Sequence, residues 1–316
     1  MKTITLLTDL NRQGILTDEQ LHALSDIHLK KRFSLHRELK ACIYVGVLFI
    51  LTGLGFTIKQ YYTHLGDIAI VGSLSTFAMA AFIYCFMKGN AYSSEAVESP
   101  HMAFDYVLFF GCTVYSLDIA YIETQFHILE DLWVNYLLMS AALFFYLAYR
   151  FDNRLVLSLA LSTLAAWFGF KLSDNFIHFR EYHRLYAITY AVIVFVAGSG
   201  LHRFAIKRHF LDIFLNFAAH FLFIAIISGI GHYKVFSLYF PALALCCTIA
   251  VIYALRAKRF LYLLYAILYG YVGLSIVVID IFKYAGDGIL FIYFIFSSLA
   301  VVWLIYSLSR KFKEVP

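Results

Sequence analysis

The sequence predicts an all-α, polytopic membrane protein, and three observations carry this prediction. Hydrophobic residues make up 62% of the 316 residues and charged residues only 14%, whereas a soluble domain carries about 25% charged residues. The apolar residues occur in blocks of roughly 18 or more, long enough to cross about 30 Å of hydrocarbon as a helix. Backbone amide and carbonyl groups must be paired within lipid, and the blocks are too long for barrel strands, so we expect helices.

Ten membrane-spanning helices are expected between residues 41 and 309. The predicted ranges are 41–58, 67–87, 105–123, 132–149, 154–171, 185–202, 210–228, 235–255, 260–281 and 288–308. A first span that starts in the cytoplasm places both ends of the chain there, including a cytosolic tail at 310–316. This orientation puts 19 of the 25 Lys and Arg residues on the cytoplasmic side, which is the bias that the positive-inside rule describes.

Residues 1–40 differ from the rest and predict a short cytosolic helical hairpin. Gly14 suits the end of a first amphipathic helix, and Thr17 with Gln20 forms a capping box that opens a second. A basic cluster at 30–40 comes just before the first span, and no signal-peptide pattern is visible. A protein partner could bind through this hairpin.

The charge and the cysteines exclude several other classes of protein. The net charge is +5, but the basic residues lie mostly at predicted span ends, so they indicate topology and not a nucleic-acid partner. The five cysteines fall inside apolar blocks without paired spacing, as buried small residues do. The sequence contains no Walker loop, GxGxxG or GxSxG motif. We therefore expect no cofactor and no metal, and the lipid bilayer is the expected partner.

Asp118 is the deepest acidic residue of the third predicted span. Ionisable groups within a membrane are costly, so each one is a candidate functional residue. Asp118 is too deep to reach the interface easily. We expect it to face the bundle interior and to accept a hydrogen bond from a hydroxyl group such as that of Tyr115.

The same span continues into a second polar stretch. Glu123 and His127 are four residues apart and would share a face if the helix persists that far. Such a pair could bind a metal ion or relay a proton. The alternative is that the stretch from Glu123 to Asp131 is a solvated rim that caps the next helix.

A polar stripe follows the seventh predicted span. Asp212, Asn216 and His220 recur every fourth residue, so they share one helix face and should point away from lipid. One interpretation is hydrogen bonding between helices, and the other is the wall of a polar pathway that contains a titratable histidine. Tyrosines 262, 265 and 269 form a similar stripe in the ninth span, as expected from aromatic belts and packing.

One regular spacing involves basic turns. Arg150, Arg203 and Arg256 are 53 residues apart, each in a short turn between two spans. Repeated helical hairpins, as in some transporters, would give this spacing. Two spans with two short loops also occupy about 50 residues without any repeat.

Three stretches carry a resemblance to a known family. They are Leu10 to Gln20, the glycine-bearing stretch from Gly46 to Gly55, and residues 118–131 with Gln125 and His127. These stretches resemble the bacterial membrane-protein family called domain of unknown function 2157. The resemblance implies a multi-pass protein of a bacterial inner membrane and no particular chemistry. It also draws attention to Gln125 and His127, because a polar pair at the outer end of a span recurs in that family.

The sequence leaves three functional classes open. The first is a transporter or flippase-like carrier with a polar path between Asp118, His220 and Asp212. The second is a non-catalytic membrane anchor or assembly component that uses the N-terminal hairpin. The third is a membrane-embedded enzyme with a site near Glu123 and His127.

Overall fold

The computed structural model describes Asn11, Thr17 and residues 36–101, 103–128, 132–171, 181–233, 238–282 and 287–314. Within them the chain forms ten α-helices and one short 3-10 helix, η2. Their bounds are α3 His36–Leu65, α4 Asp67–Lys88, α5 Phe104–Phe126, α6 Trp133–Phe151, α7 Arg154–Lys171, α8 Glu181–Arg203, η2 Arg208–Phe210, α9 Leu211–Tyr233, α10 Tyr239–Ala257, α11 Phe260–Phe282 and α12 Asp287–Glu314.

The all-α, polytopic prediction is confirmed, with one helix at each of the ten predicted ranges. Eight of these helices are long and apolar enough to cross a membrane. In α3 and α7 the apolar stretches are shorter, at Cys42–Thr57 and Arg154–Phe170, so ten complete crossings stay a prediction. Sidedness also stays a prediction. Most of the N-terminal hairpin expected at 1–40 lies outside the described residues.

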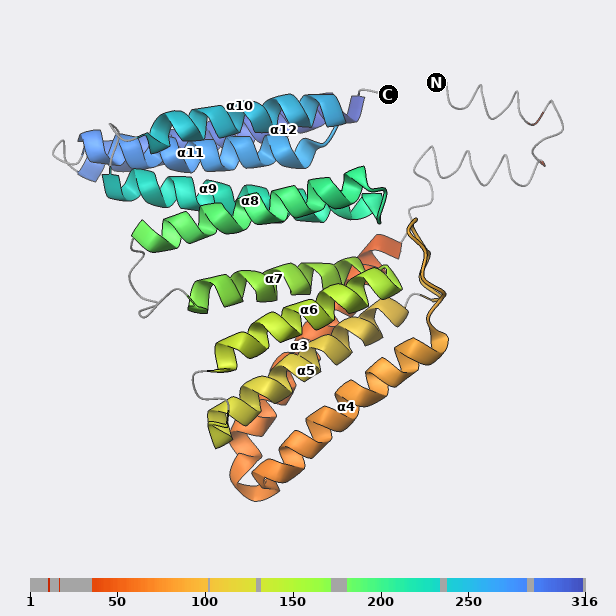
Figure 1. Ribbon diagram of the computed structural model, residues 1–316. Helices are drawn as coiled ribbons and strands as arrows, with labels where there is room; N and C mark the ends of the chain where they lie inside the picture. The colour runs from red at the N-terminus through yellow and green to blue at the C-terminus, as the bar shows by residue number, and fades with distance from the viewer. Residues whose placement is uncertain are drawn as a thin grey trace.

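The helices lie side by side in one row of packed hairpins, with α4 at one end and α10 to α12 at the other (Figure 1). Successive helices form antiparallel pairs, which pack most closely as α4 with α5, α6 with α7, α8 with α9, and α10 with α11. Short turns join the last three of these pairs, whereas the longer segment 89–103 joins α4 to α5. In each pair, neighbours in sequence are neighbours in space.

Left-handed residues end several helices at these turns. His127, Asp152 and Lys258 have φ angles of 49°, 56° and 52°. The backbone N–H of each donates to the carbonyl four residues earlier, which satisfies one of the orphan carbonyl groups of a helix end. α10 begins at Tyr239 rather than near 235, so Pro241 falls in the first turn, where a missing N–H costs no helical hydrogen bond.

α9 connects two apolar cores. Its first half, with Phe214 and Ala218, joins a core built from α4 to α9. Its second half, with Phe223, Ile226 and Ile230, joins a core shared with α10 and α11. The two halves of the bundle are therefore held together through one helix.

Small residues bring α9 close to its neighbours. A Cβ atom at Gly198 of α8 would lie 2.4 Å from the Cβ atom of Phe214. A Cβ atom at Gly229 of α9 would lie 2.4 Å from the ring of Tyr239. Close backbone approach at small residues is the usual way in which helices associate in lipid, where apolar burial gives little drive.

A buried ion network fixes the segment between α4 and α5 against two turns. Asp152 forms ion pairs with Lys207 at 3.0 Å and His209 at 2.5 Å, and the side chains of Asp152 and Lys207 are 4% and 1% exposed. The backbone N–H of Val97 donates to Asp152 at 2.6 Å, and the Lys207 ammonium donates to the carbonyl of Glu95 at 2.9 Å. The network therefore ties three segments that are far apart in sequence.

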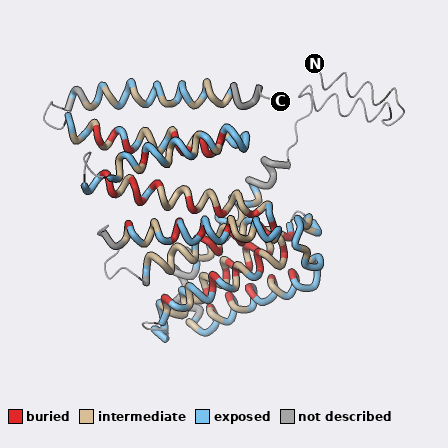
Figure 2. The backbone as a smooth tube through the Cα atoms, turned by 45° about the horizontal axis from the view of Figure 1, so that its top comes forward, coloured by how far each residue is buried: buried red, intermediate tan, exposed pale blue. Residues whose placement is uncertain are grey.

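The last helix lies at the edge of the bundle. Its apolar stretch Leu290–Arg310 has no buried residue in the membrane-length window, and Figure 2 shows it without the colour of buried residues. It packs mainly against α11, where the hydroxyl groups of Tyr271 and Ser297, and of Ser275 and Tyr293, are each 3.0 Å apart.

Candidate functional site

Asp118 lies between α4 and α5, and its hydrogen-bond donor is Ser75. The Ser75 hydroxyl donates to Oδ2 of Asp118 at 2.5 Å. The donor is a hydroxyl group, as expected, but it belongs to Ser75 and not to Tyr115, whose ring packs edge-on against Phe144. Asp118 is 6% exposed, and its Oδ1 has no hydrogen-bond partner among the described residues. The inward orientation predicted for Asp118 agrees with this burial.

Asp212 and His220 contact residues of α11 and the turn before it, whereas Oδ1 of Asn216 is buried with no hydrogen-bond partner among the described residues. Asp212 forms an ion pair with Arg259 at 2.8 Å at the start of that helix. About two turns further along α9, Nδ1 of His220 lies 2.6 Å from the hydroxyl of Tyr269, and the His220 ring packs on that of Tyr265. The two stripes that the sequence shows separately therefore pack against each other, as hydrogen bonding between helices requires.

Asp118 and His220 do not share a site in the described part of the chain. The hydrogen bond of Asp118 is to α4, whereas His220 bonds only to α11. Helices α6, α7 and α8 come between these two pairs in the bundle (Figure 1). A path that runs from Asp118 to His220 therefore has no structural support.

The stretch from Glu123 to His127 is not one helical face. α5 ends at Phe126, and His127 is the left-handed residue whose backbone N–H donates to the carbonyl of Glu123 at 3.0 Å. Gln125 and His127 are exposed, whereas Glu123 is half-buried. The condition for a Glu123–His127 pair, a helix that continues through both residues, is not met.

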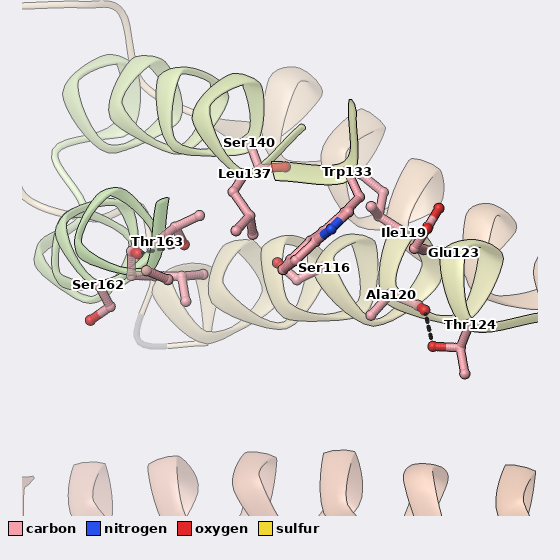
Figure 3. A pocket seen from close by; sticks show the side chains of 12 residues that line it. Ser116, Ile119, Ala120, Glu123, Thr124, Trp133, Leu137, Ser140, Ser162 and Thr163 are labelled. Atoms are coloured by element: carbon pink, nitrogen blue, oxygen red, sulfur yellow. Dashed lines mark hydrogen bonds between the residues drawn. The ribbon is translucent and has the colours of Figure 1, made fainter. Parts of the chain in front are cut away.

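Glu123 instead lies at a groove between α5, α6 and α7. We call it the hydroxyl-lined groove; its volume is about 540 Å³. It is lined by Ser116, Ile119, Ala120, Glu123, Thr124, Trp133, Leu137, Ser140, Leu159, Ser162, Thr163 and Ala166. Figure 3 shows these side chains coming from three helices, with the indole of Trp133 extending from α6 toward α5.

The hydroxyl groups of this groove are oriented by their own helices. Ser116 donates to the carbonyl of Cys112 at 3.1 Å, Thr124 to that of Ala120 at 2.7 Å, and Thr163 to that of Leu159 at 2.9 Å. A hydroxyl that donates to a backbone carbonyl keeps its acceptor lone pairs. The groove therefore offers hydrogen-bond acceptors and one carboxylate beside an apolar wall.

Trp133, which lines the groove, has an aromatic neighbour on α7. The rings of Trp133 and Phe170 meet edge to face with centroids 4.8 Å apart. Ala120, Thr124 and Ser162 are exposed, so the groove opens on the side of the bundle. A ligand that enters there would come from the surface that faces lipid.

Most of the groove was not singled out in the sequence. Glu123 is its one member among the predicted site residues. Ser116, Ala120, Glu123 and Thr124 follow helical spacing, which is a weak signal because serine and threonine are common in membrane helices. Nothing in the sequence links this stripe to Ser140 on α6 or Thr163 on α7, since both belong to other predicted spans.

No group of three or more His, Cys, Asp or Glu side chains that could hold a metal ion occurs among the described residues. Asp118 instead accepts a hydrogen bond from Ser75, Asp212 pairs with Arg259, and Asp152 pairs with Lys207. Binding by hydrogen bonds and shape is the chemistry that the hydroxyl-lined groove can support.

Comparisons with known proteins give one family. No match was found among curated proteins or among solved structures. A family model matches a region that includes α3 to α6 and the start of α7, and so reaches the α5 and α6 walls of the hydroxyl-lined groove. Residues 8–157 of this multi-pass chain match the family described as Predicted membrane protein (DUF2157), as the resemblance in the sequence indicated.

Proposed function

We propose that the protein is a transporter or flippase-like carrier that moves an amphiphilic molecule along the hydroxyl-lined groove. The observation that carries this proposal is the groove itself, in which hydroxyl groups of three helices and the carboxylate of Glu123 line a space of about 540 Å³. Pockets of roughly 300–1,000 Å³ are the usual size for small-molecule sites.

The two kinds of lining residue favour an amphiphile. Ser116, Ser140 and Thr163 can accept hydrogen bonds from a polar head. Ile119, Leu137 and Leu159 offer apolar contact to an alkyl chain. The carboxylate of Glu123 further favours a head group that is cationic or rich in hydrogen-bond donors.

The location of the groove supports movement within the membrane. Two of its helices, α5 and α6, are long and apolar enough to cross a bilayer. Its exposed lining residues lie on the side of the bundle, where a molecule dissolved in one leaflet could enter without crossing water. We propose that both termini are cytoplasmic because of the distribution of the Lys and Arg residues. The proposed location, a bacterial inner membrane, follows from the resemblance of the sequence to a bacterial membrane-protein family.

The test is lipid movement in vesicles that contain the purified protein. A fluorescent lipid with an amine-bearing head is placed in both leaflets, and a quencher that does not cross the bilayer reports its exchange. We expect Ser116→Leu, which fills the groove, and Thr163→Val, which removes one hydroxyl, to slow exchange several-fold.

Matched controls separate the groove from general damage. Ser73→Leu alters an exposed serine of α4, and Thr113→Val removes a hydroxyl that donates to Phe109 outside the groove. Both controls should exchange lipid at the wild-type rate. Equal rates for all four variants and the wild type would overturn the proposal.

The alternative function is a membrane anchor or assembly component that acts through residues 1–40. Deleting residues 1–38 tests it directly. Loss of function in the deletion, with normal function in Ser116→Leu and Thr163→Val, would favour assembly over transport. An enzyme at Glu123 and His127 has no geometric support, because the helix ends between them.

A further inference from the structure

A second groove lies among α8, α9, α10 and α11, and it shares no lining residue with the hydroxyl-lined groove. We call it the apolar groove; its volume is about 600 Å³. We infer that it binds one acyl chain of an anionic phospholipid, whose phosphate lies between Arg203 and Arg256. This site is separate from the proposed transport path, so either can fail without the other.

The apolar groove has a floor and two walls. Residues of α9 from Leu211 to Phe223 form the floor, because α9 packs against both α8 and α10. Phe195 on α8 and Ile249 on α10 line the walls and are 51% and 56% exposed. Its lining residues in the described part of the chain include no charged side chain. A long space of this kind, open to the lipid side, fits a hydrocarbon chain.

The groove runs from the middle of the bundle toward the turns that carry the basic residues. Its last lining residue on α8 is Ser199, one turn before that helix ends at Arg203. On α10 it is Tyr253, one turn before that helix ends at Ala257. The acyl chain would therefore lie in the leaflet next to these turns.

Two arginines continue the walls of the groove. Arg203 follows Ser199 by four residues and Arg256 follows Tyr253 by three, spacings that keep both arginines on the groove-lining faces of their helices. Both are exposed, and neither has an ion-pair partner among the described residues. A guanidinium binds phosphate oxygens with two parallel hydrogen bonds. A zwitterionic head group offers the same phosphate, but its own cation is repelled by the two arginines, so a head group with net negative charge binds more tightly.

Two acidic residues near these turns are paired within the protein: Asp212 with Arg259, and Asp152 with Lys207 and His209. Glu95, in the segment that Lys207 contacts, is exposed. Because Arg203, Arg208 and Arg256 are exposed as well, the net exposed charge at this end of the groove is positive, which gives the complementarity that an anionic head group requires.

The three arginines that are 53 residues apart differ in whether they already have partners within the protein. Arg150, the first of the three, donates to the carbonyl of Asn90 at 2.6 Å and lies over the ring of Phe151. It is occupied within the protein. The other two, Arg203 and Arg256, remain available on the two walls of one groove.

The experiment measures lipid binding to the full-length protein in a neutral detergent. Phosphatidylglycerol and phosphatidylcholine with the same acyl chains are added in turn, and bound lipid is counted by native mass spectrometry. We expect the wild type to retain one phosphatidylglycerol in clear excess over phosphatidylcholine. Arg203→Gln with Arg256→Gln should lower phosphatidylglycerol retention to the phosphatidylcholine level.

A control of equal charge tests whether the effect is local. Lys88→Gln with Arg154→Gln removes two exposed basic residues from the same side of the bundle, away from the groove. This control should keep the preference for phosphatidylglycerol. The inference would be overturned if both double variants lost phosphatidylglycerol retention equally, or if the Arg203 and Arg256 double variant lost none.

A second pair of variants tests the acyl chain. Ala250→Phe fills the apolar groove, whereas Ala244→Phe places the same ring on an exposed face of α10 outside it. Only Ala250→Phe should lower retention of the lipid. If inorganic phosphate alone raises the unfolding temperature as much as phosphatidylglycerol does, the site binds free phosphate and the lipid assignment is wrong.

Discussion

The hydroxyl of Tyr269 and Nδ1 of His220 lie 2.6 Å apart, and they join α11 to the middle of α9. Tyr269 also stacks on Phe223 with ring centroids 4.8 Å apart. His220 therefore has its polar partner within the same pair of helices that forms the second apolar core. The contact has the geometry of a helix-to-helix bond and leaves His220 away from the hydroxyl-lined groove.

Removing the Tyr269 hydroxyl should destabilise this pair of helices. Tyr269→Phe keeps the ring and leaves the imidazole without its partner, so we expect a loss of about 1 kcal/mol, the usual range for such bonds in membranes. Thermal unfolding in detergent measures the change. Tyr146→Phe, which alters an exposed tyrosine, should unfold like the wild type; equal behaviour of the two variants would contradict the assigned role.

Ser75 and Asp118 should be energetically coupled. Ser75→Ala removes the hydrogen bond to Oδ2, and because Oδ1 has no partner among the described residues, the carboxyl group is left without one. We expect a cost of about 1–3 kcal/mol. In a double-mutant cycle with Asp118→Leu, Ser75→Ala should cost much less, since the buried carboxyl is gone. If the changes in unfolding free energy of the two single variants simply add in the double variant, the hydrogen bond contributes nothing to stability.

Gly198 should be intolerant of a methyl group. Its Cβ would meet the Cβ of Phe214, which moves only if α8 and α9 separate, so Gly198→Ala should cost about 1–3 kcal/mol. Gly200 has no atom within 4 Å of its Cβ position. Gly200→Ala should therefore leave stability unchanged or raise it by up to about 1 kcal/mol through helix propensity. Chemical denaturation of the two variants gives the comparison.

Asp152 should hold the segment 89–101 in place. Asp152→Asn leaves the buried ammonium of Lys207 without its counter-ion, which typically costs about 3–5 kcal/mol. Hydrogen exchange should rise at Val97, whose N–H donates to Asp152. Glu95→Gln, at an exposed side chain of the same segment, serves as the control. Unchanged exchange in Asp152→Asn would show that other contacts hold the segment.

The sequence predicts the helices well because the bilayer itself sets their length. A span must be about 20 apolar residues long whatever it packs against, and each of the ten predicted ranges contains a helix. The ends were predicted less well: α3 begins at His36 and α10 at Tyr239. Turn chemistry and packing decide such boundaries, and hydropathy does not report them.

The candidate site was harder to predict because lipid and protein interior are equally apolar. A stripe of charged and amide groups, such as Asp212 to His220, stands out and indicates a packed face. Single hydroxyl groups such as those of Ser116 and Thr163 do not stand out, because each donates its hydrogen bond to a backbone carbonyl of its own helix. The partner of Asp118 is 43 residues away on α4, and no local pattern indicates which neighbouring helix will supply it.

The marginal position of α12 bears on the order in which the bundle assembles during synthesis. α12 adds little to the two larger cores and is attached mainly by two tyrosine–serine contacts to α11. Among the described residues, α3 to α11 can therefore complete their packing before α12 joins them. Adding α12 then rearranges neither of the two larger cores.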